Sequence, residues 1–239
     1  MGLIPYEQLT IDGKNCSEYG VWISGGGTFN APPRDMDTIS IPGRDGDIFF
    51  DNGRFQNINV TYPAFISKRF APRMDDFRAW LCSKYHYMKI EDSYHPDEFR
   101  LGVFKGGLTV STTARNLSGS FNLTFNCKPQ RYLKSGEMPV RFTASGSIYN
   151  PTEYAAKPLI KCYGTGGTVT IGGVAVTVTG CTNHVTLDCD LMESYEGDTN
   201  RNGTTTLVNG EFPTLGAGAS AVTFSGFSRV EITPRWWKL

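Results

Sequence analysis

Residues 119–134 read GSFNLTFNCKPQRYLK. Every second residue from Phe121 to Cys127 is apolar, and the residues between them are asparagine or threonine. This two-residue period is typical of a β-strand with one buried face. Pro129 follows, with a lysine directly before it and an arginine two residues later, and it lacks the N–H that a sheet ladder uses. We therefore expect the strand, and with it a first domain, to end here.

Length and charge agree with two domains. The chain has 239 residues, and a break near residue 135 predicts domains at 1–135 and 136–239. The first holds 16 Lys and Arg against 14 Asp and Glu, and the second holds 7 against 9, so the nets of +2 and −2 cancel. Neither carries a basic stripe for phosphate binding, so we expect no sequence-specific binding of nucleic acid.

Targeting and metal-binding signals are missing. The sequence opens without a basic segment, and no apolar run reaches membrane-spanning length, so we expect no export and no membrane insertion. The three histidines stand apart from one another, which predicts no metal and no other cofactor. The six cysteines are scattered without a Cys-x-x-Cys pair, and we expect unpaired, mostly buried thiols. They are Cys16, Cys82, Cys127, Cys162, Cys181 and Cys189.

The periodicity predicts a mainly β fold, a β-rich α+β protein. In the first domain, Met74, Phe77, Trp80 and Leu81 recur at helical spacing and predict one amphipathic helix over 72–85. The rest of the first domain alternates as strands, including one from Phe55 to Tyr62 after a turn at Asn52 and Gly53. This predicts a β-sandwich-like domain with one helix.

The second domain alternates short strands with glycine turns, which predicts a β-sandwich. The polar residues 196–205 are expected to form a flexible surface loop. The expected strands are near 140–143 and at 159–163, 168–171, 174–178, 185–189, 221–225 and 229–233.

Catalytic signatures are not found. The sequence has no Gly-x-Ser-x-Gly motif, and none of its histidines lies in a recognisable catalytic pattern, so we expect no enzyme. Asp47 and Asp51 lack the spacing of a calcium loop. Trp236 and Trp237 are explained more simply by core packing or subunit contact than by a sugar-stacking platform.

Several short motifs, in their order along the chain, resemble the phage distal tail proteins of long non-contractile tails. In the first domain they are Pro42-Gly43-Arg44-Asp45-Gly46, the helix around Trp80 and Leu81, and Phe125-Asn126-Cys127-Lys128-Pro129. In the second they are Asn150, Pro158, Val185 to Asp188, Gly210-Glu211-Phe212-Pro213, Leu215, Gly218 and Ile232-Thr233-Pro234-Arg235-Trp236.

This resemblance implies a structural virion protein at the phage tail tip, made in the bacterial cytoplasm. It implies a homo-hexameric ring of first domains, a galectin-like second domain, and a central channel through which phage DNA passes. The implied partners are the tail tube protein, the tail-associated hub protein and the receptor-binding or baseplate proteins. The alternative function is a carbohydrate-binding adhesion module of a tail tip, although the chain lacks the His-x-Asn-x-Arg and Trp-x-x-Glu patterns of sugar-binding galectins.

Within the resemblance, the turn at residues 42–47 is the candidate ring interface. Arg44 and Asp45 are opposite charges at its tip, and Gly43 and Gly46 supply the backbone freedom that a tight turn uses. In a closed ring, such a tip meets the next subunit. The alternative is a solvated hairpin end.

Overall fold

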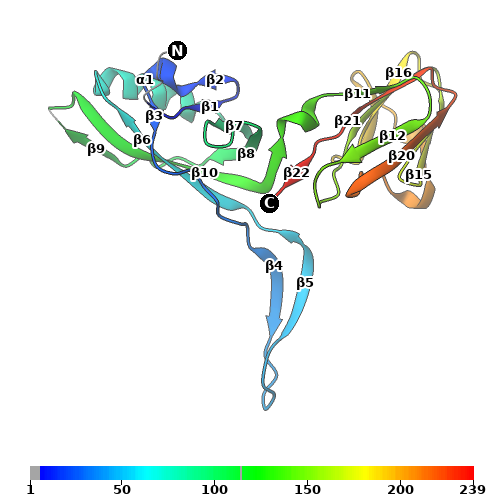
Figure 1. Cartoon of the computed structure of the whole chain (residues 1–239), viewed down its shortest axis with the longest axis horizontal. Coiled ribbons are helices and arrows are strands. Elements are labelled where there is room, and N and C mark those ends of the chain that lie inside the picture. Colours follow the sequence, from blue (N-terminus) through cyan, green and yellow to red (C-terminus); the bar gives the residue numbers. More distant parts are fainter. Residues whose placement is uncertain (1–5, 114) are drawn as a thin grey trace. The chain divides into compact units, whose positions relative to one another are not determined.

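The computed structural model describes residues 6–113 and 115–239. The chain divides into two compact units, Met1–Arg131 with Leu239, and Tyr132–Lys238 (Figure 1). Strands dominate both units, and the described residues contain one α-helix and four short 3-10 helices. The predicted mainly β class is confirmed. The 3-10 helices are η1 (Cys16–Tyr19), η2 (Lys134–Glu137), η3 (Asn202–Thr204) and η4 (Val208–Gly210).

The first unit is built around one antiparallel sheet in the order β2-β1-β7-β8-β10-β6-β3, with β9 beside β10. Its last strand, β3, returns to the segment just before β1, because the Ile23 N–H donates to the Glu7 carbonyl at 3.1 Å and forms an antiparallel bridge. One curled sheet therefore encloses the first core. Its strands are β1 (Leu9–Ile11), β2 (Lys14–Asn15), β3 (Trp22–Ile23), β6 (Ile58–Ile66), β7 (Met88–Asp92), β8 (Glu98–Phe104), β9 (Val110–Thr113) and β10 (Ser118–Leu133).

Strand β10 is the predicted alternating strand, but it continues beyond its predicted end. Its inward residues alternate from Phe121 through Cys127 to Pro129, and the strand ends only at Leu133. Pro129 is tolerated because pairing with β6 ends earlier, at Cys127, so no β6 carbonyl requires its N–H. The prediction that Pro129 ends the strand is wrong.

The helix α1 spans Phe70–Cys82, so it begins two residues before the predicted helix and ends three residues earlier. Phe70 begins it because this side chain is buried and its N–H donates to the Leu117 carbonyl at 3.1 Å. At the other end, Lys84 lies outside the helix, with its ammonium 3.4 Å from the Asp12 carboxylate. The predicted apolar face is confirmed for Met74, Phe77 and Leu81, whereas Trp80 is only partly buried against the first core. Phe70 is buried as well.

Gly102 on β8 lies where a side chain would not fit. A Cβ built there is 2.7 Å from Cys127 Sγ and 2.8 Å from Ile90 Cδ1, and both neighbours are buried. We expect Gly102→Ala to lower the free energy of unfolding by about 1–3 kcal/mol, because overpacking displaces the core. Gly26→Ala is the control, since its Cβ meets nothing within 4 Å. Equal urea midpoints for the two variants would contradict this packing.

The second unit is a sandwich of two antiparallel sheets around a second core. The predicted strands of this unit are confirmed. One sheet runs β11-β21-β13-β16-β17-β18, comprising Val140–Phe142, Arg229–Thr233, Leu159–Tyr163, His184–Asp188, Glu193–Glu196 and Thr199–Asn200. The other runs β12-β20-β14-β15-β19, comprising Gly146–Asn150, Gly218–Ser225, Gly167–Ile171, Val174–Val178 and Thr205–Leu207. The last strand of the chain, β22 (Trp237–Lys238), belongs to neither of these two sheets.

Residues 196–205 are ordered by hydrogen bonds and do not form the expected irregular loop. The Glu196 carboxylate accepts the N–H groups of Thr182 and Asn183 at 2.9 Å each, and it pairs with Arg201 at 2.5 Å. The hydrogen bond from Asn183, together with those from Arg201 and Thr182, lowers the pKa of Glu196 to about 2. This carboxylate fixes the β17–β18 hairpin to the adjacent loop.

Candidate functional site

A two-stranded hairpin in the first unit contributes no residue to either hydrophobic core. It consists of β4 (Arg34–Ile39) and β5 (Ile48–Phe55), which among the described residues pair only with each other. Figure 1 shows the pair as a long ribbon that extends away from the sheet of its own unit. We call residues 34–55 the arm.

The arm carries apolar side chains on both faces. Residues paired directly across an antiparallel ladder share a face. The Thr38–Phe49 pair therefore lies on one face, and the Asp37–Phe50 and Ile39–Ile48 pairs lie on the other. Phe49 is 64% exposed and Phe50 is 63% exposed. The remaining exposed apolar residues of the arm are Met36, Ile39, Ile41 and Ile48.

Ion pairs hold the base of the arm together. Arg34 donates from Nε to Asp51 Oδ2 at 2.8 Å, and Arg54 donates from Nε to Asp35 Oδ2 at 2.6 Å. Hydrogen bonds from Arg34 and from the Gly53 N–H lower the pKa of Asp51. At the base of the arm, these four charged side chains therefore have partners within the chain.

Gly53 marks an irregularity near the base and not a turn. Asn52 and Gly53 both lie inside β5, where Gly53 has a φ of +72° and the register shifts between Arg34 and Met36. Such a shift, with a left-handed glycine, is a β-bulge. The predicted turn at Asn52 and Gly53 is therefore wrong, and the chain leaves the ribbon at residues 56–57, before β6.

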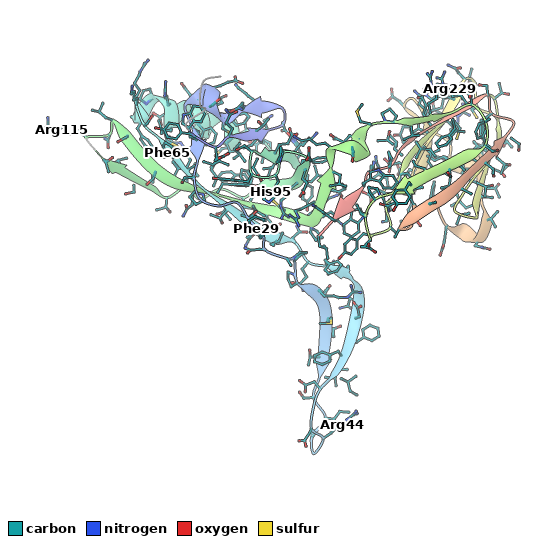
Figure 2. All side chains as sticks on the ribbon, in the orientation of Figure 1. Phe29, Arg44, Phe65, His95, Arg115 and Arg229 are labelled. Carbon is teal, nitrogen blue, oxygen red and sulfur yellow. The ribbon has the colours of Figure 1, made fainter. Side chains whose placement is uncertain are left out.

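The tip of the arm holds the predicted site residues. Figure 2 shows Arg44 at the far end of the ribbon. Gly43 and Gly46 have φ of +81° and +82°, a left-handed conformation that favours glycine. Arg44 and Asp45 are exposed, and neither side chain has a hydrogen bond or ion pair with the described residues. The structure thus places both residues on the surface, without an internal partner.

This arrangement is suited to contact with another chain. An isolated two-stranded ribbon is only marginally stable in water. Exposing apolar side chains on both of its faces is a further free-energy cost, which contact with another chain would remove. Burying a phenylalanine side chain contributes about 1.5–3 kcal/mol. Because Phe49 and Phe50 are about two-thirds exposed, covering both gives roughly 2–4 kcal/mol per arm, which is a substantial contribution to an interface.

The apolar part of the site was missed from the sequence. The turn residues predicted Arg44 and Asp45 as site residues, whereas no role was predicted for Ile48, Phe49 and Phe50. The available signal was that apolar residues occur at both odd and even positions of β4 and β5. A strand with one buried face keeps its apolar residues on that face, so this pattern indicates a ribbon that is covered on both sides.

Other candidate sites have structural roles. Trp236 is buried in the second core, and the Trp237 ring stacks on Tyr154 with centroids 4.5 Å apart. The six cysteines are free thiols, and five are buried. Over residues 6–113 and 115–239, no group of three metal-ligating side chains is found. Within the same residues, no helix has both the length and the apolar character to cross a membrane.

Comparison with known proteins gives a matching family model for part of the first unit and a similar fold for the whole chain. Residues 14–127 match the model of the phage tail protein RIFT-related domain. No curated protein sequence matches the chain. The fold is similar to the crystal structure of SPP1 Dit (gp 19.1), described as a paradigm of the hub adsorption apparatus in Gram-positive infecting phages. That match has a TM-score of 0.75 and 15% identity, and it covers 98% of this chain and 99% of that chain.

The fold is also similar to a chain of the phage p2 baseplate in its activated conformation. In the structures with strontium and with calcium, the TM-score is 0.54 and the identity is 12%. The match covers 95% of this chain and 96% of that chain in both.

Proposed function

We infer that the chain is a structural protein of the phage tail tip, because residues 14–127 match the model of the phage tail protein RIFT-related domain and the whole chain has a fold similar to that of a tail hub protein. The expected resemblance to phage distal tail proteins is confirmed. A role in the distal tail or baseplate, in contact with other tail proteins, follows from these matches.

We propose further that six copies form a closed ring. The arm is the observation that carries this proposal, because its two apolar faces and unpaired tip are suited to a neighbouring subunit. The arm of one copy lies against a different surface of the next copy, which is a heterologous contact that closes into a ring. The number six comes from the resemblance to distal tail proteins.

The ring joins the tail tube to the tail-associated hub and to the receptor-binding or baseplate proteins. In this proposal the first units surround a channel for phage DNA, and the second units are galectin-like domains that project outward. The predicted domain boundary near residue 135 is part of the same proposal, with ring formation assigned to the first domain.

Electron microscopy of the purified chain tests the ring. We expect closed particles with six-fold symmetry and a central channel. Two-fold dimers or open filaments would contradict it, because both require a different interface geometry.

Charge reversal at the tip tests the role of Arg44. We expect Arg44→Glu to weaken assembly by several kcal/mol per contact, because a pair between subunits becomes repulsive. Lys105→Glu is the matched control, since Lys105 is exposed beside another glycine turn. If Arg44→Glu elutes at the wild-type mass with an unchanged thermal midpoint, the tip is a solvated hairpin end.

A further inference from the structure

Uncharged side chains cover the outer face of β6, β9 and β10 in the first unit. Successive side chains of a strand point to opposite faces, and the odd-numbered residues of β10 from Phe121 to Cys127 enter the first core. The even-numbered residues from Ser118 to Asn126, and the residues paired with them on β6 and β9, therefore form the outer face. We call this surface the neutral face, because apart from Pro63 and Phe65 it consists of serine, threonine and asparagine.

The neutral face is solvated, and its polar groups bond to one another. None of its residues is buried. The hydroxyls of Thr61 and Thr124 share a hydrogen bond of 2.9 Å, and Asn126 Nδ2 donates to Asn59 Oδ1 at 3.1 Å. Unlike the arm, this face has few large apolar side chains, so it gains little free energy from being covered.

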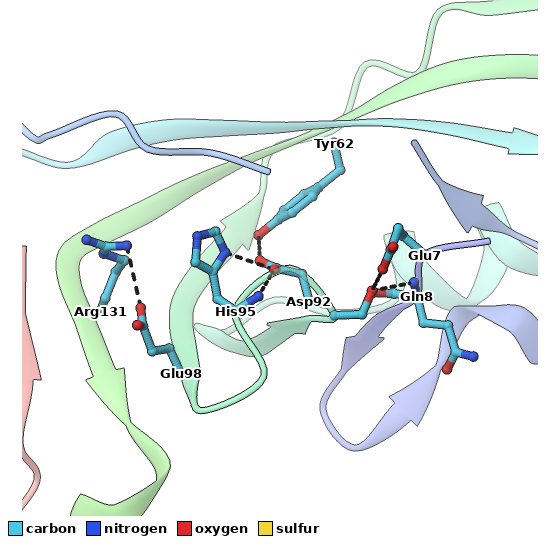
Figure 3. Close-up of polar contacts among 8 residues, drawn as sticks. Glu7, Gln8, Tyr62, Asp92, His95, Glu98 and Arg131 are labelled. Atoms are coloured by element: carbon cyan, nitrogen blue, oxygen red, sulfur yellow. Dashed lines mark hydrogen bonds and ion pairs between the residues drawn. The ribbon is translucent and has the colours of Figure 1, made fainter. Parts of the chain in front are cut away.

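Charged side chains occur on the inner side of the same sheet, where they are paired. Tyr62 of β6 points inward, and its hydroxyl donates to Asp92 Oδ2 at 2.9 Å (Figure 3). Figure 3 also shows Arg131, farther along β10, with its Nη1 3.5 Å from Glu98 Oε2. On the outer side, Lys128 is the next outward residue of β10 and ends the neutral face.

Absence of charge is not a general property of the outward sheet faces of this chain. In the second unit, Lys161 of β13 lies opposite Glu231 of β21, and Tyr163 lies opposite Arg229. These four residues alternate with buried residues of their strands, so they lie on the outward face. About a quarter of the residues of a typical soluble domain are charged. The neutral face therefore requires an explanation in the function of the first unit.

Duplex DNA responds strongly to the charge of a surface beside it. It carries one negative charge per about 1.7 Å of its axis, and each Lys or Arg contact to a phosphate adds affinity. A wall of cations holds the duplex in place, and a wall of carboxylates repels it. Hydroxyl and amide side chains carry no net charge, so a wall of such groups lets a duplex slide past.

We propose that the neutral face forms the wall of the ring channel and faces duplex DNA during its passage. The inference rests on the proposed ring, and it assigns the outer side of β6, β9 and β10 to the channel. The alternative occupant is the arm of the next copy. An apolar ribbon laid on this face takes amide and hydroxyl groups away from water without giving them partners, which costs free energy. The composition of the face therefore favours the channel.

A lysine on the neutral face tests what the face meets. Asn122 is exposed in the middle of the face. We expect the ring of Asn122→Lys to bind a linear duplex about tenfold or more tighter than the wild-type ring in about 50 mM salt, because one added cation per subunit faces the phosphates. With about six added contacts, this affinity falls by about 10³-fold on going to about 200 mM salt.

Covalently closed circular DNA separates a channel from an outer surface. A circle cannot thread a closed ring, so we expect Asn122→Lys rings to retain the linear duplex and to release the circle. Ser147→Lys is the matched control, since Ser147 is exposed on β12 of the second unit, and we expect no selectivity for linear DNA from it. Retention of both forms by Asn122→Lys rings, or of neither, overturns the assignment of the neutral face.

Thiol labelling tests whether an arm covers the face. In a Cys82→Ser background the remaining native cysteines are buried, so the thiol of Asn122→Cys is the reactive one. We expect it to react in the ring within about tenfold of its rate in urea, because the channel is solvated. A larger loss of rate in the intact ring shows that a neighbouring chain covers the face, and it overturns the proposal. The native mass of each sample, measured first, separates this outcome from a failure of the ring itself.

Discussion

Replacing Phe49 and Phe50 together by serine is expected to leave the chain folded but monomeric. Both rings are more than 60% exposed in the single chain, so the substitution removes little packing within it. In the ring, each variant arm loses the burial of the exposed two-thirds of two phenylalanines, roughly 2–4 kcal/mol per interface. Light scattering should show one subunit, and the thermal midpoint should not fall below that of a dissociated wild-type chain.

A matched double substitution controls for the loss of exposed aromatic residues. Tyr85 and Tyr149 are 90% and 70% exposed and lie outside the arm. We expect the variant with serine at both positions to keep the wild-type mass. If it dissociates as readily as the Phe49/Phe50 variant, general surface hydrophobicity drives association and the arm has no special role.

The second large effect is expected at the ion pair between Asp188 and Arg235. Arg235 donates from Nη1 and Nη2 to the two Asp188 oxygens at 2.7 and 2.9 Å, and Asp188 is buried. We expect Arg235→Met to lower the free energy of unfolding of the second unit by about 3–5 kcal/mol, because it leaves a buried carboxylate without its cation. Urea unfolding at neutral pH measures this loss.

The pH dependence of the same pair has a defined sign. Burial alone raises the pKa of Asp188, but hydrogen bonds from Arg235 and from the Leu191 N–H outweigh this effect and lower the pKa below the usual value of an aspartate. A lowered folded-state pKa stabilises the fold above the unfolded-state pKa, and this contribution is lost as the pH falls through the folded-state pKa. We expect the stability deficit of Arg235→Met relative to wild type to shrink on acidification, because protonation of Asp188 removes the ion-pair contribution in wild type and the unpaired buried charge in the variant.

The control for this pair lies on the same unit. Arg141 pairs with Glu231 at 3.1 Å, but the Arg141 side chain is 60% exposed. An exposed pair contributes about 0–1 kcal/mol, so we expect Arg141→Met to change the urea midpoint little. Equal losses for Arg141→Met and Arg235→Met would show that burial does not set the strength of these pairs.

The positions of strands and of the helix were largely predictable, because an element with one buried face has apolar residues at a regular spacing in the sequence. Phe121 to Cys127 and the helix around Phe77 both show this, and the structure places their apolar residues in the first core. The ends of the elements were not predictable, because tertiary contacts set them. Pro129 remains in β10 only because β6 has already ended, and Phe70 begins α1 through its bond to Leu117.

The candidate sites were less predictable than the fold. Arg44 and Asp45 could be placed at a tip because the turn residues around them are local signals. The exposure of Phe49 and Phe50 depends on where the ribbon lies relative to the rest of its unit, and an apolar residue is more often buried than exposed.

The mass of the purified wild-type chain in solution tests the ring most directly. Native mass spectrometry over the micromolar range is predicted to give one dominant species of about 158 kDa, the mass of six copies of a 26.4 kDa chain. A single species of 26.4 kDa throughout that range would contradict the ring.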